Sequence, residues 1–453
     1  MKRTILAILL SFALTSTYAQ CWKSVSTGQN HTVAIRIDGS LWAWGQNYYG
    51  QLGNGANTNS NTPVKVGNAF IWKSIATGLS HTAAIRTDGS LWAWGNNNNG
   101  QLGIGSNVNK NVPTRVGNDA YWQSISSVGA YCLAIKTDGT LWAWGKNTDG
   151  QLGIGNLTNA NVPVQVGIAN TWKSVSAGIT HSAAIKTSGS LWAWGENTYR
   201  QLGDGTSVSK TSPVNISTEP WKSVDVGAYH TVAVKANGTL WAWGQNSDGR
   251  LGTGTTTPVN TPVRIGTLST WANAYAGYNF TVAIKIDGSI WASGSNSNQQ
   301  LGDGTYDDRS VLAQVETALN WKEAAPSEAY ILAMKTDGSL WSWGDNYYGQ
   351  LGIGSNENSS HPTTVICPAL AVDEQVADTE IVLYPNPAGA EININISDNR
   401  EIDKVIIADI SGKIVYEKDG NTTQIDTENL ARGMYILQAF SDDEIFSEKF
   451  MKL

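Results

Sequence analysis

Short runs of apolar and polar residues return along most of this chain with a fixed spacing. In the first unit, Trp22–Thr27 alternates apolar with polar side chains, His31–Arg36 contains β-branched residues, and Leu41–Trp44 and Pro63–Val66 are two further runs. Each run has the length of a strand, and none is long or periodic enough for a helix. A long polar stretch over 46–62 joins the last two runs. The pattern predicts four short antiparallel strands per unit.

The unit occurs seven times. Its opening tryptophan recurs at intervals of 50 residues, with one interval of 49, at Trp22, Trp72, Trp122, Trp172, Trp221, Trp271 and Trp321. Periods of this size are typical of solenoids, propellers and arrays. Four antiparallel strands repeated radially make a propeller blade, and a closed ring removes most exposed sheet edges. We therefore expect an all-β protein in which residues 20–367 form a seven-bladed β-propeller.

A turn signal separates the second run from the third in every unit. The pairs are Asp38-Gly39, Asp88-Gly89, Asp138-Gly139, Ser188-Gly189, Asn237-Gly238, Asp287-Gly288 and Asp337-Gly338. Asx–Gly pairs favour a two-residue type I′ hairpin, because both central residues of that turn need positive φ. The later Gly53-Asn54-Gly55 motif also recurs, and no helix follows it, so it does not indicate a phosphate-binding loop.

Three motifs of the repeat are more specific than its period. They are Gly-x-x-His-Thr-x-Ala-Ile, Asp-Gly-x-Leu-Trp-x-Trp-Gly and Asn-x-x-Gly-Gln-Leu-Gly-x-Gly, and their copies cover roughly residues 21–367. They resemble the regulator of chromosome condensation repeat family, which is known for seven-bladed propellers. One member is a nuclear exchange factor for a small GTPase, and another is a secreted bacterial protein that inhibits β-lactamases by binding them. The resemblance implies protein binding more than any single activity.

The N-terminus has the features of a secretory signal peptide. Met1-Lys2-Arg3 is positively charged, residues 4–16 are mostly apolar, and Thr17-Tyr18-Ala19 offers small residues before a cleavage site. We expect residues 1–19 to be removed. A lipidated Cys21 is the alternative, which the preceding Gln20 disfavours. No other apolar stretch of the sequence is long enough to span a membrane.

The composition changes after Cys367, where tryptophan ends and acidic residues become frequent. We expect a linker over 368–378 and a separate domain over 379–453. Its motifs resemble the C-terminal sorting domain of type IX secretion cargo in the Bacteroidetes, which implies a small β-sandwich read by the outer-membrane machinery. The protein would then reach the cell surface or the medium after periplasmic transit; an ordinary small β-domain is the alternative. The matching residues lie in an opening motif, a Gly-Lys strand and a Gly-x-Tyr strand: Tyr384, Pro385, Asn386, Pro387, Gly412, Lys413, Gly433 and Tyr435.

Two of the three cysteines stand at the two ends of the predicted ring. Against the other connecting turns, Cys367 falls at the place of Asn68 and Cys21 at the place of Ile71. Residues three apart in a turn often lie under ~7 Å from each other, and a disulfide needs roughly 4.4–6.8 Å between Cα atoms. We predict a Cys21–Cys367 disulfide that contributes roughly 4–5 kcal/mol by chain entropy; two unpaired thiols are the alternative. Cys132 is expected to be a small buried side chain.

Charge and candidate chemistry narrow the function. The net charge is −7 and charged residues make up 15% of the chain, so no basic patch for nucleic acid is expected. Four of the five histidines share one repeat position, which holds tyrosine or phenylalanine in the other units, so we expect packing rather than catalysis or metal binding: His31, His81, His181 and His230, against Tyr131, Phe280 and Tyr330. Asp303, Asp307 and Asp308 lie in one loop, and a calcium site formed by them is an alternative that the sequence does not decide. No cofactor is expected.

Loops that differ between copies are the candidate binding surface. The loops joining strands one and two, and three and four, emerge at the same end of the ring. Tyrosine and arginine are favoured binding anchors there, and blades one and seven are neighbours in a closed ring, so two tyrosine pairs should meet. The candidates are Tyr48, Tyr49, Tyr199, Arg200, Tyr229, Tyr278, Tyr347 and Tyr348. Tyr199-Arg200 is aligned with Tyr48-Tyr49, and Glu328 lies in a companion loop. Structural tyrosines in relaxed loops are the alternative.

These observations favour a monomeric, secreted or surface-displayed binding module with a protein partner. A glycan-binding adhesin is the alternative, since tyrosine and asparagine loops also suit sugars. An enzyme is disfavoured because no convergent set of acid–base groups is visible. Guanine-nucleotide exchange is disfavoured outside the cytoplasm, where no small GTPase is met.

Overall fold

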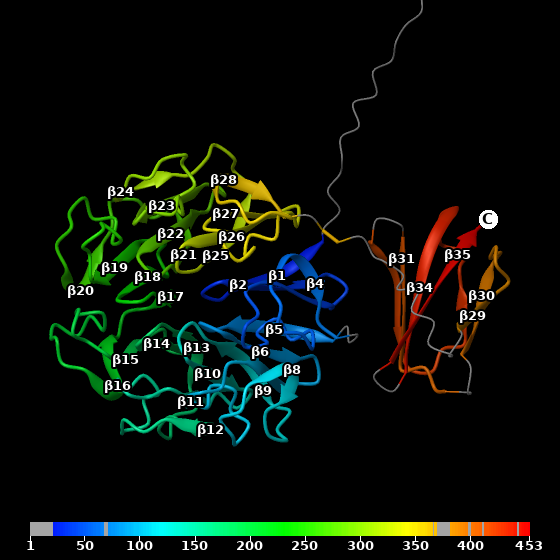
Figure 1. Cartoon of the computed structure of the whole chain (residues 1–453), viewed down its shortest axis with the longest axis horizontal. Coiled ribbons are helices and arrows are strands. Elements are labelled where there is room, and N and C mark those ends of the chain that lie inside the picture. Colours follow the sequence, from blue (N-terminus) through cyan, green and yellow to red (C-terminus); the bar gives the residue numbers. More distant parts are fainter. Residues whose placement is uncertain are drawn as a thin grey trace, which may run out of the picture.

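The computed structural model describes residues 21–67, 71–365, 367–368, 381–396, 400–409, 412–441 and 444–453. They form seven four-stranded antiparallel sheets in a ring, followed by a small β-sandwich (Figure 1). The predicted all-β, seven-bladed architecture is therefore confirmed. The predicted signal peptide 1–19 and nearly all of the predicted linker 368–378 lie outside the described residues. No helix in these ranges is long and apolar enough to cross a membrane.

The first four blades are built from consecutive strands. Blade 1 holds β1 (Trp22–Thr27), β2 (His31–Arg36), β3 (Leu41–Gly45) and β4 (Ser60–Lys65). Blade 2 holds β5 (Trp72–Thr77), β6 (His81–Arg86), β7 (Leu91–Gly95) and β8 (Lys110–Arg115). Blade 3 holds β9 (Trp122–Ser126), β10 (Tyr131–Lys136), β11 (Leu141–Gly145) and β12 (Ala160–Gln165). Blade 4 holds β13 (Trp172–Ala177), β14 (His181–Lys186), β15 (Leu191–Gly195) and β16 (Lys210–Ser217).

The last three blades repeat the same order. Blade 5 holds β17 (Trp221–Val226), β18 (His230–Lys235), β19 (Leu240–Gly244) and β20 (Val259–Arg264). Blade 6 holds β21 (Trp271–Ala276), β22 (Phe280–Lys285), β23 (Ile290–Gly294) and β24 (Arg309–Gln314). Blade 7 holds β25 (Trp321–Pro326), β26 (Tyr330–Lys335), β27 (Leu340–Gly344) and β28 (Ser359–Thr364). The fourth strand begins earlier than predicted, because Ser60 pairs with Gly45 across a bulge.

The first strand of each blade lies nearest the ring axis and the fourth lies at the rim (Figure 1). Strand β1 contacts β5 of the next blade and β25 and β26 of blade 7, which closes the ring. The apolar core fills the spaces between blades. At the closing junction, Trp22 and Trp44 of blade 1 pack with Leu332 and Leu351 of blade 7.

The turn between the second and third strands differs from the predicted type I′ hairpin. Gly39 has a φ of +82°, but Asp38 is not among the residues with positive φ. Gly39 N–H donates to Arg36 O, and Arg36 N–H donates to Ser40 O, which gives a three-residue loop with a left-handed glycine. The Asp38 carboxylate accepts hydrogen bonds from the Ser40 N–H and hydroxyl at 2.9 and 2.6 Å. Aspartate is therefore favoured by its side-chain bonds rather than by a left-handed backbone.

Buried pairs link each blade to the next along the histidine position. His31 Nε2 lies 3.1 Å from the Thr82 hydroxyl, and His181 and His230 make the corresponding contacts with threonines of the following blade. In blade 6 the histidine is replaced by Phe280, and the next blade offers Ile331 in the same apolar cluster. The predicted packing is confirmed, but the hydrogen bond is the rule and not an occasional feature, because Tyr131 and Tyr330 also bond Ser182 and Thr32 of the following blade. The sequence prediction did not include the paired residue on the next blade.

The predicted disulfide is present. Cys21 and Cys367 are bonded, with Cα atoms 6.0 Å apart. Cys21 precedes the innermost strand of blade 1 and Cys367 follows the rim strand of blade 7, so the bond stands where a connecting turn joins the other blades. Cys132 is a free, buried thiol.

The C-terminal domain consists of two facing sheets. One has the order β29-β30-β33 and the other β32-β31-β34-β35. Leu383, Ile394, Val405, Leu437 and Phe450 belong to the core between them. The strands are β29 (Ile381–Tyr384), β30 (Glu391–Ile396), β31 (Lys404–Asp409), β32 (Ile414–Asp419), β33 (Gln424–Asp426), β34 (Gly433–Ser441) and β35 (Glu444–Lys452).

Candidate binding face and sorting motif

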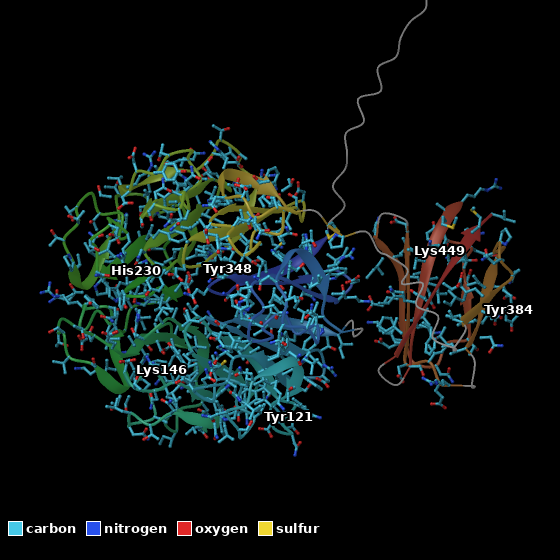
Figure 2. All side chains as sticks on the ribbon, viewed as in Figure 1. Tyr121, Lys146, His230, Tyr348, Tyr384 and Lys449 are labelled. Atoms are coloured by element: carbon cyan, nitrogen blue, oxygen red, sulfur yellow. A yellow bond between two sulfur atoms is a disulfide. The ribbon has the colours of Figure 1, made fainter. Side chains whose placement is uncertain are left out.

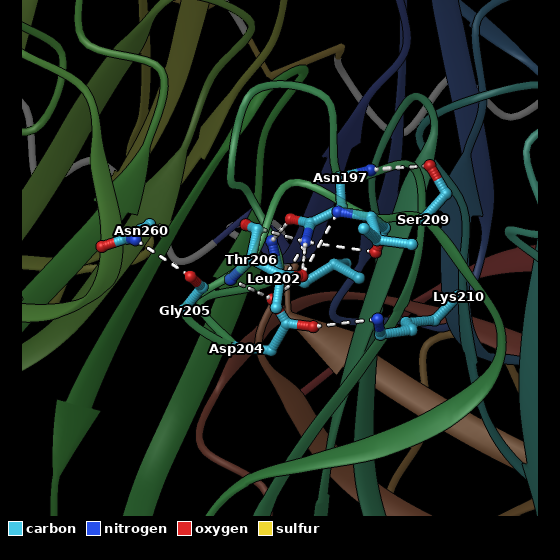
Figure 3. Close-up of polar contacts among 9 residues, drawn as sticks. Asn197, Leu202, Asp204, Gly205, Thr206, Ser209, Lys210 and Asn260 are labelled. Carbon is cyan, nitrogen blue, oxygen red and sulfur yellow. Dashed lines mark hydrogen bonds and ion pairs between the residues drawn. The ribbon is translucent and has the colours of Figure 1, made fainter.

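The loop between the third and fourth strands of each blade is fixed by one asparagine. In blade 4, Asn197 Oδ1 accepts a hydrogen bond from Leu202 N–H at 3.0 Å, and Asn197 Nδ2 donates to Asp204 and to Thr206 O (Figure 3). The Ser209 hydroxyl accepts from Asn197 N–H at 3.2 Å. The same asparagine-to-leucine bond occurs in all seven blades. The asparagine was visible in the repeat motif, but its structural role was not predicted.

Each of these loops also reaches over the next blade. Gly205 N–H donates to Asn260 O, and Asn260 Nδ2 donates back to Gly205 O at 3.0 Å. Gln51 O accepts from Trp94 Nε1 of blade 2 at 3.0 Å. Gly53 has a φ of +72°, and a Cβ there would lie 2.5 Å from Trp94 Nε1, so the Gly-x-Gly motif permits close packing between blades. The loops therefore form a continuous, internally bonded surface.

The loops between the first and second strands lie at the same end of the ring. Gln46 N–H, at the end of β3, donates to Asn30 O in the neighbouring loop at 2.8 Å. We call this end of the ring the loop face. At its centre is a small hollow whose apolar lining includes Leu79, Val128, Ile179 and Ala228. On the side of blades 1 and 7 it is lined by Gln29 and Glu328, which share a hydrogen bond of 2.6 Å.

The tyrosines predicted to meet at the junction of blades 1 and 7 do so, with one exception. The ring centroids of Tyr48 and Tyr348 are 5.9 Å apart, and those of Tyr347 and Tyr348 are 4.9 Å apart. Tyr48 and Tyr347 are 58% and 71% exposed. We call these three residues the seam cluster. No ring contact joins Tyr49 to them within the described residues, although Tyr49 is also exposed.

A second group, which we call the lateral cluster, spans blades 4, 5 and 6. The rings of Tyr199 and Tyr229 are 4.8 Å apart, and those of Tyr229 and Tyr278 are 6.2 Å apart. Tyr278 also lines the central hollow. Each residue was a sequence candidate, but their contact was not predicted, because it depends on two loop types meeting across blade junctions.

The alignment of Tyr199-Arg200 with Tyr48-Tyr49 was wrong by one residue. Tyr199 N–H donates to the side chain of Gln201, as Tyr49 N–H donates to that of Gln51, so Tyr199 matches Tyr49. Arg200 therefore stands where blade 1 has Gly50, and it adopts a left-handed φ of +67°. A non-glycine residue in this region of φ is strained.

Arg250 was missed in the sequence. It replaces the glutamine found at this loop position in the six other blades and is only 2% exposed. Its guanidinium pairs with the Asp248 carboxylate, and its Nε and Nη1 have no hydrogen-bond partner among the described residues. Burial lowers the pKa of Arg250, which Asp248 opposes. The signal was the change from Gly-Gln-Leu-Gly to Gly-Arg-Leu-Gly.

The aspartates considered for calcium are used by their own loop. Asp308 Oδ1 accepts from Asn296 N–H at 2.8 Å, and Asp303 pairs with Arg309. Although burial alone would raise it, hydrogen bonds from Thr305 and Arg309 lower the pKa of Asp303. Asp307 is exposed in the same loop. Across the part of the chain that the structure describes, no three His, Cys, Asp or Glu side chains gather as a metal site.

The residues with the most perturbed titration are buried in the ring. Burial lowers the pKa of His31, His81 and His181 to about 3 and raises that of Cys132 to about 12. His81 Nε2 lies 3.2 Å from Cys132 Sγ. At neutral pH these groups are therefore a neutral imidazole and a thiol, and the pair lacks the thiolate that nucleophilic chemistry needs.

The sorting motif binds the end of the chain. Asn386 Nδ2 donates to Lys449 O and Asn386 Oδ1 accepts from Met451 N–H, both at 3.0 Å. Ala388 N–H donates to Met451 O, and Leu453 N–H donates to Ala388 O. Strand β35 is at the edge of its sheet, so these bonds occupy an edge that no strand covers.

The other predicted motif residues have local roles. Gly412, with a φ of +84°, and Lys413 lie in the turn between β31 and β32, so the predicted Gly-Lys strand was wrong there. Gly433 opens β34, as predicted. The Tyr435 hydroxyl donates to Ala431 O, and its ring stacks on Phe450 at 5.6 Å. The exposed Tyr384 ends β29, and Pro385 and Pro387 flank Asn386 (Figure 2).

Similarity to solved structures supports the fold. Human WBSCR16 is 20% identical with a TM-score of 0.65, covering 73% of this chain and 94% of that one. Prp20p of Saccharomyces cerevisiae, described with its binding to Gsp1p and histones, is 20% identical with a TM-score of 0.66, covering 78% and 89%. Yeast Prp20 bound to Kap60 is 18% identical with a TM-score of 0.65, covering 82% and 92%. At these identities the likeness shows the fold alone.

Family profiles match both parts of the chain. The RCC1-like domain matches residues 10–282, and the regulator of chromosome condensation (RCC1) repeat matches residues 337–372. The secretion system C-terminal sorting domain matches residues 382–452, which indicates secretion or surface display through the type IX system and contact with its machinery. The chain belongs to the RCC1-like domain family, as a seven-bladed propeller exported by means of its own C-terminal sorting domain.

Proposed function

We propose that the propeller recognises a protein partner through its loop face, outside the cell or at its surface. The seam cluster carries the proposal, because Tyr48 and Tyr347 are more than half exposed while they and Tyr348 contact one another across two blades. Tyrosine supplies a large contact area at low entropic cost, and it is enriched at binding surfaces. Single exposed apolar residues need no explanation, but grouped ones indicate interaction sites.

The rigidity of the loops supports the same proposal. The seam tyrosines stand on loops held by Asn47 and Asn346, which accept hydrogen bonds from Leu52 N–H and Leu351 N–H at 2.9 Å. Ordering of interface loops is a cost of association. A surface whose loops are already bonded in place avoids most of this cost.

The size of the surface favours a macromolecule. The lateral cluster and the seam cluster belong to blades on different sides of the central hollow, whose lining includes Tyr278 of blade 6 and Glu328 of blade 7. A ligand that covers both clusters in full must extend over five blades, from blade 4 round to blade 1. A folded protein meets this requirement.

An enzymatic role is not part of the proposal. Among the described residues, the four histidines at the shared repeat position are buried with lowered pKa, and Cys132 is buried with a raised pKa. None of them lies on the loop face. The candidate anchors are tyrosines, which serve contact better than proton transfer at neutral pH.

The test is capture with the full mature chain, followed by measurement of Kd with each identified partner. We expect Y48A/Y347A/Y348A to weaken binding at least ten-fold. The matched control is Y121A. Tyr121, labelled in Figure 2, is 65% exposed, and its carbonyl accepts a hydrogen bond from Thr137 N–H at the end of the ring opposite the loop face. Equal loss in both variants, or unchanged binding in the triple variant, would refute the loop face. Binding on a glycan array in place of a protein would refute the choice of partner.

A further inference from the structure

The outer face of one sheet in the sorting domain has an unusual composition. In β34, Tyr435, Leu437 and Ala439 point into the core. The residues between them therefore point outward, and they are Met434, Ile436, Gln438 and Phe440. A two-layer antiparallel domain usually has polar residues on its outer faces. Here only one of the four outward residues is polar.

The strand register extends this apolar surface onto both neighbours of β34. Met434 pairs with Met451, and Phe440 pairs with Ile445. On the other side, Ile436 pairs with Ala408, and Ile406 is the next outward residue of β31. Met434 and Met451 are the most exposed of the set, at 41% and 39%. Ile406 itself is buried and is not available for contact. We call the following residues the methionine face: Ala408, Met434, Ile436, Phe440, Ile445 and Met451.

One of the positive charges that border this face has no ion pair among the described residues. Lys449 is exposed, pairs across the strands with Ile436, and stands two residues before Met451 on the same side of β35. Its ammonium group makes no ion pair within the described residues. Lys404, at the other end of β31, differs because it pairs with Glu417 and Asp419. Lys449 is therefore available to a carboxylate from another molecule (Figure 2).

The sorting motif fixes the strand that carries Lys449 and Met451. Asn386 binds the backbone of both residues with its side-chain amide, and Ala388 binds the backbone at Met451 and Leu453. Asn386 and Ala388 stand near the start of the domain sequence, whereas Lys449, Met451 and Leu453 stand at its end. The motif therefore holds the border of the methionine face in one geometry, and Asn386 acts on that face as a positioning residue.

We propose that the methionine face is the surface by which the sorting domain docks on a protein of the secretion machinery, and that the partner offers an apolar surface with a carboxylate opposite Lys449. A sorting domain must be recognised by the secretion machinery, so a protein of that machinery is the partner expected on this face. Methionine is flexible and polarisable, so it adapts to a partner surface. The inference is independent of the function proposed for the propeller.

The test follows export of the full chain in a host with the type IX system. We expect M434S/M451S to reduce the extracellular amount at least ten-fold, with accumulation in the periplasm, and K449E to reduce it several-fold. The matched control is V382S, because Val382 is 47% exposed on the other sheet, between Ile381 and Leu383, which contact the core. Thermal unfolding of each purified chain separates folding defects from docking defects, and K449E keeps the test valid where the double variant unfolds.

A photo-crosslinker at position 438, in the middle of the face, identifies the occupant. A crosslink to a component of the secretion machinery, lost in K449E, is the expected result. Export of folded M434S/M451S and K449E at the level of the control would overturn the proposal. A crosslink to the propeller of the same chain, or to a second copy, would overturn it as well.

Discussion

Ser293 and Leu312 lie together against Gly252, where the six other blades pack an indole ring against the equivalent glycine. A Cβ on Gly252 would lie 3.1 Å from Ser293 Oγ and 3.2 Å from Leu312 Cγ, whereas one on Gly53 would meet Trp94 at 2.5 Å. Leu312 stands at the position that is proline in the six other blades. Leucine in place of proline on β24 thus accompanies serine in place of tryptophan on β23 of the same blade.

This pairing predicts coupled mutations. S293W alone should destabilise by about 1–3 kcal/mol, because the ring enters space that Leu312 borders. S293W/L312P restores the residues of the other blades and should recover most of that loss. A double-mutant cycle from denaturant unfolding measures the coupling. Additive effects of the two substitutions would contradict the shared space.

Removal of the disulfide should weaken the whole ring. C21S/C367S frees the two ends of a loop of 346 residues, and the chain-entropy model gives a loss of about 6 kcal/mol for a loop of this length. The measurement is urea unfolding with and without reductant. Reductant should lower the midpoint of the wild type to that of the variant and leave the variant itself unchanged. An unchanged wild-type midpoint would contradict the structural role.

Acid should destabilise the propeller through its buried histidines. Their pKa in the folded state is about 3 for His31, His81 and His181, below the usual value of about 6.5. Between these values the unfolded chain binds more protons than the folded one, so stability is greatest above pH 6.5 and falls as the pH falls toward 3. Each such histidine changes the free energy of unfolding by up to about 1.4 kcal/mol per pH unit.

A variant built from another junction tests the histidine effect. H181F/T231I reproduces the Phe280–Ile331 pair that joins blades 6 and 7. It should remove one titrating group and reduce the slope of unfolding free energy against pH. A slope equal to that of the wild type would show that other groups, such as carboxylates, dominate the acid response.

Replacement of Arg250 should be tolerated. In blade 3, Gln151 Nε2 donates to Asp149 at 3.3 Å, and R250Q can make the same contact with Asp248. Removing a buried charge and its desolvation cost should leave stability within about 1 kcal/mol of the wild type or raise it. Thermal unfolding checks this. A loss of several kcal/mol would show that the ion pair stabilises blade 5.

Loss of Asn386 should release the end of the chain. N386A removes the bonds to Lys449 O and Met451 N–H, each net contribution being about 1 kcal/mol. Hydrogen exchange at Met451 should increase, while exchange in β31 stays unchanged. N393A, which removes a single bond to Tyr384 O, is the control. Equal exchange at Met451 in wild type and N386A would contradict the role of Asn386 in fixing the end of the chain.

Repetition explains how much of the fold could be predicted. The strands that open each unit were predicted to the residue in blade 1, and the repeat register alone brought Cys21 and Cys367 together. The turn type was wrong because the Asp38 side chain, and not its backbone, provides the preference. The recurring Asp-Gly pair is compatible with both turns, and the coordinates show which of them forms.

The candidate site was predicted less completely, because it lies where the repeat varies. The contact of Tyr48 with Tyr348 followed from ring closure, but that of Tyr199 with Tyr229 joins two loop types and needs coordinates. Arg200 was misaligned because a glycine position had accepted a side chain. Arg250 was overlooked as one changed letter in a motif assigned to scaffold.

The bond between Cys21 and Cys367 closes the ring covalently, so that all seven junctions between blades are joined by covalent bonds. Every blade is contiguous, and the disulfide does at one junction what a short turn does at the six others. The packing of the seven blades therefore does not depend on which junction the disulfide closes. A circular permutant would join residue 367 to residue 21 through a turn. Its new chain ends would lie at another junction, which a new pair of cysteines would close. It would have the same seven blades in a different order of synthesis.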